Sequence, residues 1–70
     1  MEIKNEEHAA EMLDKWSQLP VPTRKNQIKL AIEKLELNSM YYEQKGNDKG
    51  VTRSENCIIL LRNYLSALEK

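Results

Sequence analysis

The chain has 70 residues, and its 11 basic and 11 acidic side chains cancel to a net charge of zero. A domain dedicated to duplex nucleic acid normally carries a basic excess, so nucleic-acid binding is not expected. One cysteine, Cys57, and one histidine, His8, exclude an internal disulfide and leave too few ligands for a structural metal site. A chain this short buries a thin core, so we expect it to depend on well-formed helices or on oligomerisation.

The spacing of apolar residues predicts an all-α fold, a single domain over residues 1–70 with three helices and a long central one. These helices are expected at about 6–18, 23–45 and 53–69. Asn5 is a good N-cap for the first helix, and acidic residues follow it in the first turn. The first helix should end before Pro20 and Pro22, because each residue before a proline is pushed toward extended geometry. Its predicted core face consists of Ala9, Met12, Leu13 and Trp16.

The boundary between the second and third helices carries two local signals. Gly46 stands where a helix often ends in a left-handed residue, and residues 47–50 then predict a turn or short loop. Thr52 and Glu55 have the spacing of a capping box, which predicts that the third helix begins there. The predicted core stripe of the third helix is Cys57, Leu61, Tyr64 and Leu68, widened by Ile58, Leu60 and Leu65.

The second helix is apolar on two sides, whereas a helix at the edge of a monomer needs one apolar stripe. Ile28, Ala31, Ile32, Leu35 and Tyr42 form the first side. Either the neighbouring helices cover both sides within the monomer, or one side meets a second copy or another protein. Ile59 of the third helix also points away from its core stripe. The candidate partner interface therefore comprises Leu30, Leu37, Met40, Tyr41 and Ile59.

The start of the second helix is a candidate anion site. Arg24 and Lys25 oppose the helix dipole, but together with free backbone N–H groups they would suit a phosphate or carboxylate. Thr23, Asn26 and Gln27 add further hydrogen-bonding groups. The alternative is an ordinary solvated helix start.

Catalytic chemistry is not expected from this sequence. His8 has neither a nucleophile nor an orienting partner nearby in sequence, and no cofactor-binding or metal-binding motif is present. The apolar runs are too short for a membrane span, and the acidic N-terminus does not resemble a signal peptide. A lone thiol fits a reducing compartment, so a cytoplasmic protein without a cofactor is expected.

Residues 19–42 resemble the hairpin domain of the phage sponges that evade CBASS and Thoeris defence by sequestering nucleotide signals. The resemblance lies in Leu19-Pro20, Thr23-Arg24, Ala31-Ile32, Lys34-Leu35-Glu36 and Met40-Tyr41. It implies a helical oligomer that encloses small phosphorylated nucleotides, with Thr23, Arg24 and Tyr41 as ligand residues. The family has tryptophan where Tyr41 stands.

Residues 32–68 are also similar to the two-helix hairpins of sporulation aspartyl-phosphate phosphatases. Arg62-Asn63-Tyr64-Leu65-Ser66 matches the position of their signature but lacks its acidic residue, so the resemblance implies the hairpin without the activity. The sequence thus favours a non-enzymatic binding or inhibitory protein, encoded by a phage or mobile element and acting as a homo-oligomer. A nucleotide sponge and a phosphatase-like regulatory hairpin are the alternatives.

Overall fold

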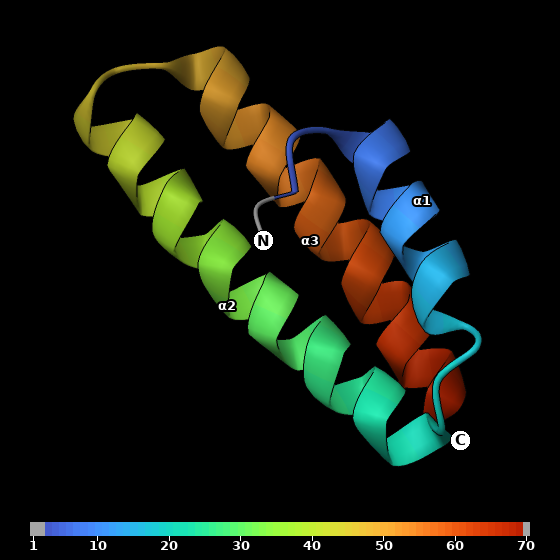
Figure 1. Cartoon of the computed structure of the whole chain (residues 1–70). Coiled ribbons are helices and arrows are strands. Elements are labelled where there is room, and N and C mark those ends of the chain that lie inside the picture. The colour runs from blue at the N-terminus through green and yellow to red at the C-terminus, as the bar shows by residue number, and fades with distance from the viewer. Residues whose placement is uncertain (1–2, 70) are drawn as a thin grey trace.

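The computed structural model describes residues 3–69 and folds them into three helices (Figure 1). These are α1 (Glu6–Trp16), α2 (Val21–Gln44) and α3 (Asp48–Leu68). Helices α2 and α3 form an antiparallel hairpin, and α1 packs mainly against α3. The all-α prediction with three helices is confirmed. The longest helix, α2, is central in the sequence, but α3 lies between the other two helices in space (Figure 1).

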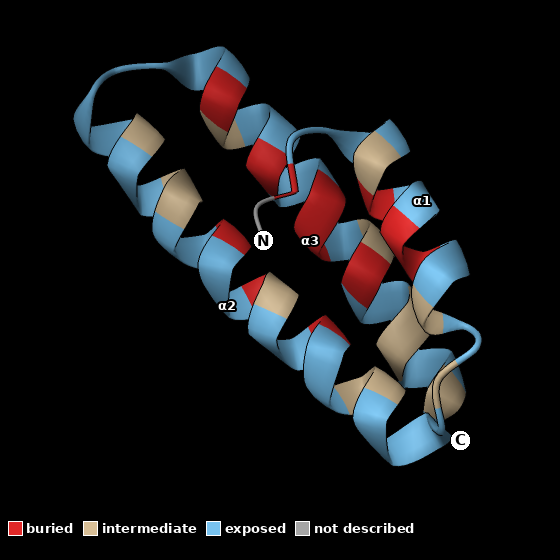
Figure 2. Ribbon diagram, in the orientation of Figure 1, coloured by how far each residue is buried: buried red, intermediate tan, exposed pale blue. Residues whose placement is uncertain are grey.

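The core lies where the three predicted apolar faces meet (Figure 2). Because these faces recur at helical spacing, each helix presents one continuous stripe to its neighbours. Ile28 and Leu61, on α2 and α3, are completely buried. Ile3, which precedes α1, is also buried in the core, although it belongs to no predicted apolar face. The other buried apolar residues are Ala9, Met12, Leu13, Ile32, Leu35, Cys57 and Ile58.

Helix α1 begins as predicted, but it ends earlier and α2 starts earlier than predicted. The Asn5 side chain accepts a hydrogen bond from the His8 backbone N–H at 2.7 Å, which confirms the N-cap. Helix α1 ends at Trp16 rather than Gln18. Helix α2 begins at Val21 rather than Thr23, because a proline such as Pro22 is tolerated in the first turn, where its missing N–H is not needed.

The turn between α2 and α3 is built around Gly46, whose φ of 72° confirms the predicted left-handed residue. Gly46 donates its backbone N–H to Glu43 at 3.1 Å, and Asn47 donates to Tyr42 at 2.9 Å. These two bonds satisfy carbonyl groups that the end of α2 would otherwise leave unpaired.

The predicted capping box at Thr52 and Glu55 is wrong, and so is the predicted loop at residues 47–50. Helix α3 begins at Asp48, so Thr52 already lies inside the helix. The cap is Asn47, whose side chain accepts the Gly50 backbone N–H at 3.0 Å. Gly50 is buried against the Tyr42 ring, and a Cβ atom there would lie 2.6 Å from Cγ of that ring. Contact between the two helices therefore uses a glycine that sequence reasoning assigned to a loop.

Replacing the observed cap should destabilise the protein more than replacing the sequence-predicted one. We expect Asn47→Ala to lower the free energy of unfolding by about 1 kcal/mol, because the Gly50 N–H loses its acceptor. We expect Thr52→Ala, at an exposed site within α3, to change it by less than about 0.5 kcal/mol. Urea denaturation measures the free energy of unfolding of both variants. A larger loss for Thr52→Ala than for Asn47→Ala would support the capping box at Thr52 and Glu55 instead.

Candidate interaction surface

One side of α2 faces away from the core, and its apolar residues are uncovered (Figure 2). Leu30, Leu37, Met40 and Tyr41 are between 55 and 65% exposed. The neighbouring helices cover only the side that contains Ile28, Ile32 and Leu35, so the alternative in which both sides are covered within the monomer does not hold. We call the exposed side of α2, with Leu30, Lys34, Leu37 and Tyr41 along its middle, the outer face.

The outer face has the spacing of a helix-pairing seam. Leu30, Lys34, Leu37 and Tyr41 follow one another at intervals of four, three and four residues. This is the alternation that keeps a stripe of one helix facing a second helix over several turns. Lys34 interrupts the apolar stripe, and its long aliphatic stem can cover apolar surface while the charge reaches solvent.

A hollow of about 340 Å³ lies beside the outer face, where α1 meets α2. Trp16, which was predicted as a core residue, is half-buried and packs against the core while also lining this hollow. Leu30, Ala31 and Leu37 supply apolar lining from α2. Such an apolar depression next to exposed leucines is typical of a surface that receives a side chain from a partner.

Tyr41 projects from the outer face near the other end of α2 and is held by its neighbours. Its ring meets the Tyr42 ring edge-on, with the centroids 5.8 Å apart and the planes at 65°. The Lys45 ammonium lies 5.6 Å from the Tyr41 ring centroid. Tyr41 is therefore an exposed aromatic group whose position is partly fixed before any partner arrives.

Ile59 is exposed at 58%, but it lies on α3 and lines neither of the hollows bordered by α2. The structure thus brings four of the five predicted interface residues onto one helix and leaves Ile59 on another. Val21, at the start of α2, is a further exposed apolar residue that the sequence reasoning did not select.

The candidate anion site at the start of α2 is built differently from the prediction. The Arg24 guanidinium donates to the backbone carbonyls of Ser17 and Leu19 at 2.9 Å each, and to that of Trp16 at 3.2 Å. Its charge therefore lies at the C-terminal end of α1, where the helix dipole favours a cation. The Arg24 backbone N–H bonds the Pro20 carbonyl, and Pro22 has no N–H, so few amide donors remain for an anion.

The other residues of the predicted anion site have separate surroundings. Lys25 is half-buried, and Thr23 is exposed in the first turn. Gln27 is exposed and lines the hollow beside Trp16. Because the Arg24 guanidinium already contacts protein carbonyls, the structural role of Arg24 accounts for its charge without a ligand.

Within residues 3–69 the side chains with acid–base or nucleophilic chemistry have separate surroundings. Cys57 is buried, and burial together with the negative charge of Glu6 raises the pKa of its thiol, while Arg53 lowers it by a smaller amount. The His8 Nδ1 atom accepts the Lys4 backbone N–H at 3.1 Å. Glu36 forms an exposed ion pair with Arg62 at 3.0 Å. Over residues 3–69 no cluster of metal-ligating side chains is present, and no helix is long and apolar enough to cross a membrane.

Comparison with known proteins gives no family for this all-α, three-helix chain. No protein-family model matches it, and neither the curated proteins nor the solved structures include a match.

Proposed function

We propose that this chain is a non-enzymatic binding protein that works through protein–protein contacts, and that a second copy of the chain occupies its outer face. The observation that carries the proposal is the row of apolar side chains on α2, each more than half exposed. Contiguous exposed apolar surface on a small domain is typical of interaction sites, whereas single exposed apolar residues are ordinary. The thin core of a chain this short favours the same conclusion, because association would bury further apolar area.

A second copy fits the outer face because the projecting Tyr41 and the hollow beside Leu30 lie at different positions along α2. In an antiparallel two-fold pairing, each feature of one copy meets the complementary feature of the other. With the axis midway between Leu35 and Glu36, Tyr41 of each copy would lie opposite Leu30 of the other. Leu37 would lie opposite the aliphatic stem of Lys34. Because the pairing is symmetric, the same contacts bury Leu30, Leu37 and the Tyr41 ring of both copies.

The biological role we propose for such a dimer is inhibition of another protein in the cytoplasm, by a small protein of phage or mobile-element origin. The small size, the neutral charge and the single buried thiol support this setting. The nucleotide sponge finds less support, because the Arg24 guanidinium already bonds backbone carbonyls at the end of α1 and in the loop that follows it. The α2–α3 hairpin resembles a phosphatase hairpin only in outline, since the segment at residues 62–66 lacks the acidic residue.

Sedimentation velocity from micromolar to millimolar concentration tests the self-association. We expect the wild-type chain to shift from monomer toward dimer as the concentration rises. Leu37→Lys should remain monomeric throughout, because in this pairing each new ammonium group would lie opposite Lys34 of the other copy, and its circular dichroism should remain helical since Leu37 is 65% exposed.

The matched control is Ile59→Lys, which makes the same change of charge at a residue that is 58% exposed on α3. This variant should dimerise like the wild type. A wild-type chain that stays monomeric at the highest concentration would overturn the proposal, as would equal effects of the two substitutions. Loss of helicity in Leu37→Lys would show instead that the outer face contributes to the fold.

A further inference from the structure

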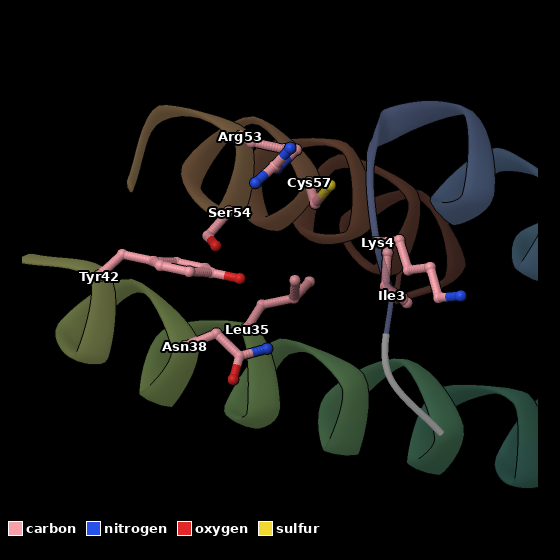
Figure 3. A pocket seen from close by; sticks show the side chains of 8 residues that line it. All are labelled: Ile3, Lys4, Leu35, Asn38, Tyr42, Arg53, Ser54 and Cys57. Atoms are coloured by element: carbon pink, nitrogen blue, oxygen red, sulfur yellow. The ribbon is translucent and has the colours of Figure 1, made fainter. Parts of the chain in front are cut away.

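A second hollow, of about 260 Å³, lies between α2, α3 and the segment that precedes α1 (Figure 3). Its apolar lining comes from Leu35 of α2 and Ile3 of the N-terminal segment. Polar side chains from both long helices complete the lining, and Tyr42 and Ser54 point their hydroxyl groups toward it (Figure 3). The hollow is independent of the outer face, because it opens on the side of α2 that contacts α3.

Two hydroxyl groups in this hollow are available to a ligand. Ser54 is only 5% exposed, and its side chain makes no hydrogen bond to another residue within 3–69. Because no fully buried side-chain oxygen or nitrogen in this range lacks a partner, the Ser54 hydroxyl is still open to the hollow. The Tyr42 hydroxyl likewise has no protein partner in this range. The Tyr42 ring is fixed by its contact with Gly50, so its hydroxyl is held in place rather than free to swing away. A nearly buried polar group in a concave site is satisfied by water or by a ligand.

The charges around the hollow favour a negatively charged ligand. Arg53 and Lys4 belong to its lining, and among residues 3–69 no aspartate or glutamate does. Among residues 3–69, Arg53 forms no ion pair within 4 Å, whereas Arg62 pairs with Glu36. The Cys57 thiol is also part of the lining, and burial keeps it protonated, so it adds no negative charge. Glu6 lies close enough to act on that thiol but does not line the hollow.

We propose that this hollow binds a small organic oxyanion, a carboxylate or phosphate group attached to a short apolar body. The oxyanion would accept hydrogen bonds from the Arg53 guanidinium and from the hydroxyls of Ser54 and Tyr42. Hydrogen bonds to charged oxygens are among the stronger ones available to a protein, and an arginine guanidinium suits such oxygens. The apolar body would rest on Leu35 and Ile3. The volume of the hollow, about 260 Å³, suits a small ligand of this kind.

Two-dimensional ¹H–¹⁵N NMR titrations with phenyl phosphate, inorganic phosphate and phenol test this assignment. Phenyl phosphate supplies both the oxyanion and the apolar body, so we expect saturable shifts at the backbone amides of Arg53, Ser54 and Cys57. Inorganic phosphate should shift the same amides with weaker affinity, and phenol should not saturate them. Absence of saturable shifts with phenyl phosphate, or equal affinity for phenol, would overturn the proposal.

Arg53→Gln and Arg62→Gln form a matched pair of variants on the same helix. Arg53→Gln should weaken phenyl phosphate binding about tenfold or more, because the oxyanion loses a charged donor. Arg62→Gln removes an arginine that is paired with Glu36, and the affinity should stay within about twofold of the wild type. Equal losses in both variants would indicate nonspecific attraction to positive charge and would contradict a site at Arg53.

Discussion

Leu61→Ala is expected to remove a large part of the stability of this protein. Leu61 is completely buried at the centre of α3, where the other two helices meet it. Deleting a buried leucine side chain costs about 2–5 kcal/mol, because apolar contacts are lost and a cavity remains. A domain of this size is expected to have a total stability of roughly 4–10 kcal/mol. Urea denaturation followed by circular dichroism measures the loss, and the variant should already be partly unfolded without urea if the total is near the lower figure.

Ile59→Ala is the control for Leu61→Ala, because it removes a side chain of the same size two residues away on the same helix. Ile59 is mostly exposed, so the free energy of unfolding should change by less than about 0.5 kcal/mol. Comparable losses of unfolding free energy in the two variants would mean that Ile59 is buried in solution. In that case α3, rather than α2, would carry the partner interface.

Arg24→Ala is expected to lower the free energy of unfolding by about 2 kcal/mol. The Arg24 guanidinium bonds the backbone carbonyls of Trp16, Ser17 and Leu19, and hydrogen bonds to charged groups are worth more than neutral ones. The substitution would also leave the C-terminal end of α1 without its nearest cation. Thermal unfolding of the purified variant measures the loss.

Lys25→Ala is the control for Arg24→Ala and should change the free energy of unfolding by less than about 0.5 kcal/mol. The comparison also separates the two interpretations of this segment. If Arg24 served mainly to bind a phosphorylated ligand, its removal would leave the free protein as stable as the wild type. The Arg24→Ala substitution would then reduce only the extra stability that a bound ligand provides.

The buried faces of the helices could be predicted from the sequence, because burial follows a repeat that a single stretch of sequence contains. Ile28, Leu35 and Leu61 fall on their predicted stripes for that reason. The first residue of α3 could not be predicted reliably from the sequence, because Asn47 and Thr52 are both good N-caps in isolation. The contact of Gly50 with the Tyr42 ring, which holds residues 48–50 in the helix, depends on the other helix.

The candidate sites depended still more on contacts between distant residues. The sequence showed that α2 has two apolar sides, but only the packing shows that Leu30, Leu37 and Tyr41 are uncovered. Arg24 resembled a ligand-binding residue because the carbonyls that it contacts lie outside its own helix. The hollow near Ser54 combines three segments, and none of them carries a motif of its own. A residue pattern within one helix cannot show such convergence.

The short connection between α2 and α3 also bears on how fast the chain folds. The two longest helices are joined through Lys45, Gly46 and Asn47, so the first contacts between them form between residues that are close in sequence. Such local contacts require little loop-closure entropy, and helical bundles that are rich in them fold in microseconds to milliseconds. Helix α1 packs mainly on α3, which is distant from it in sequence. We therefore expect the hairpin to form first, with α1 docking last and opening most readily to hydrogen exchange.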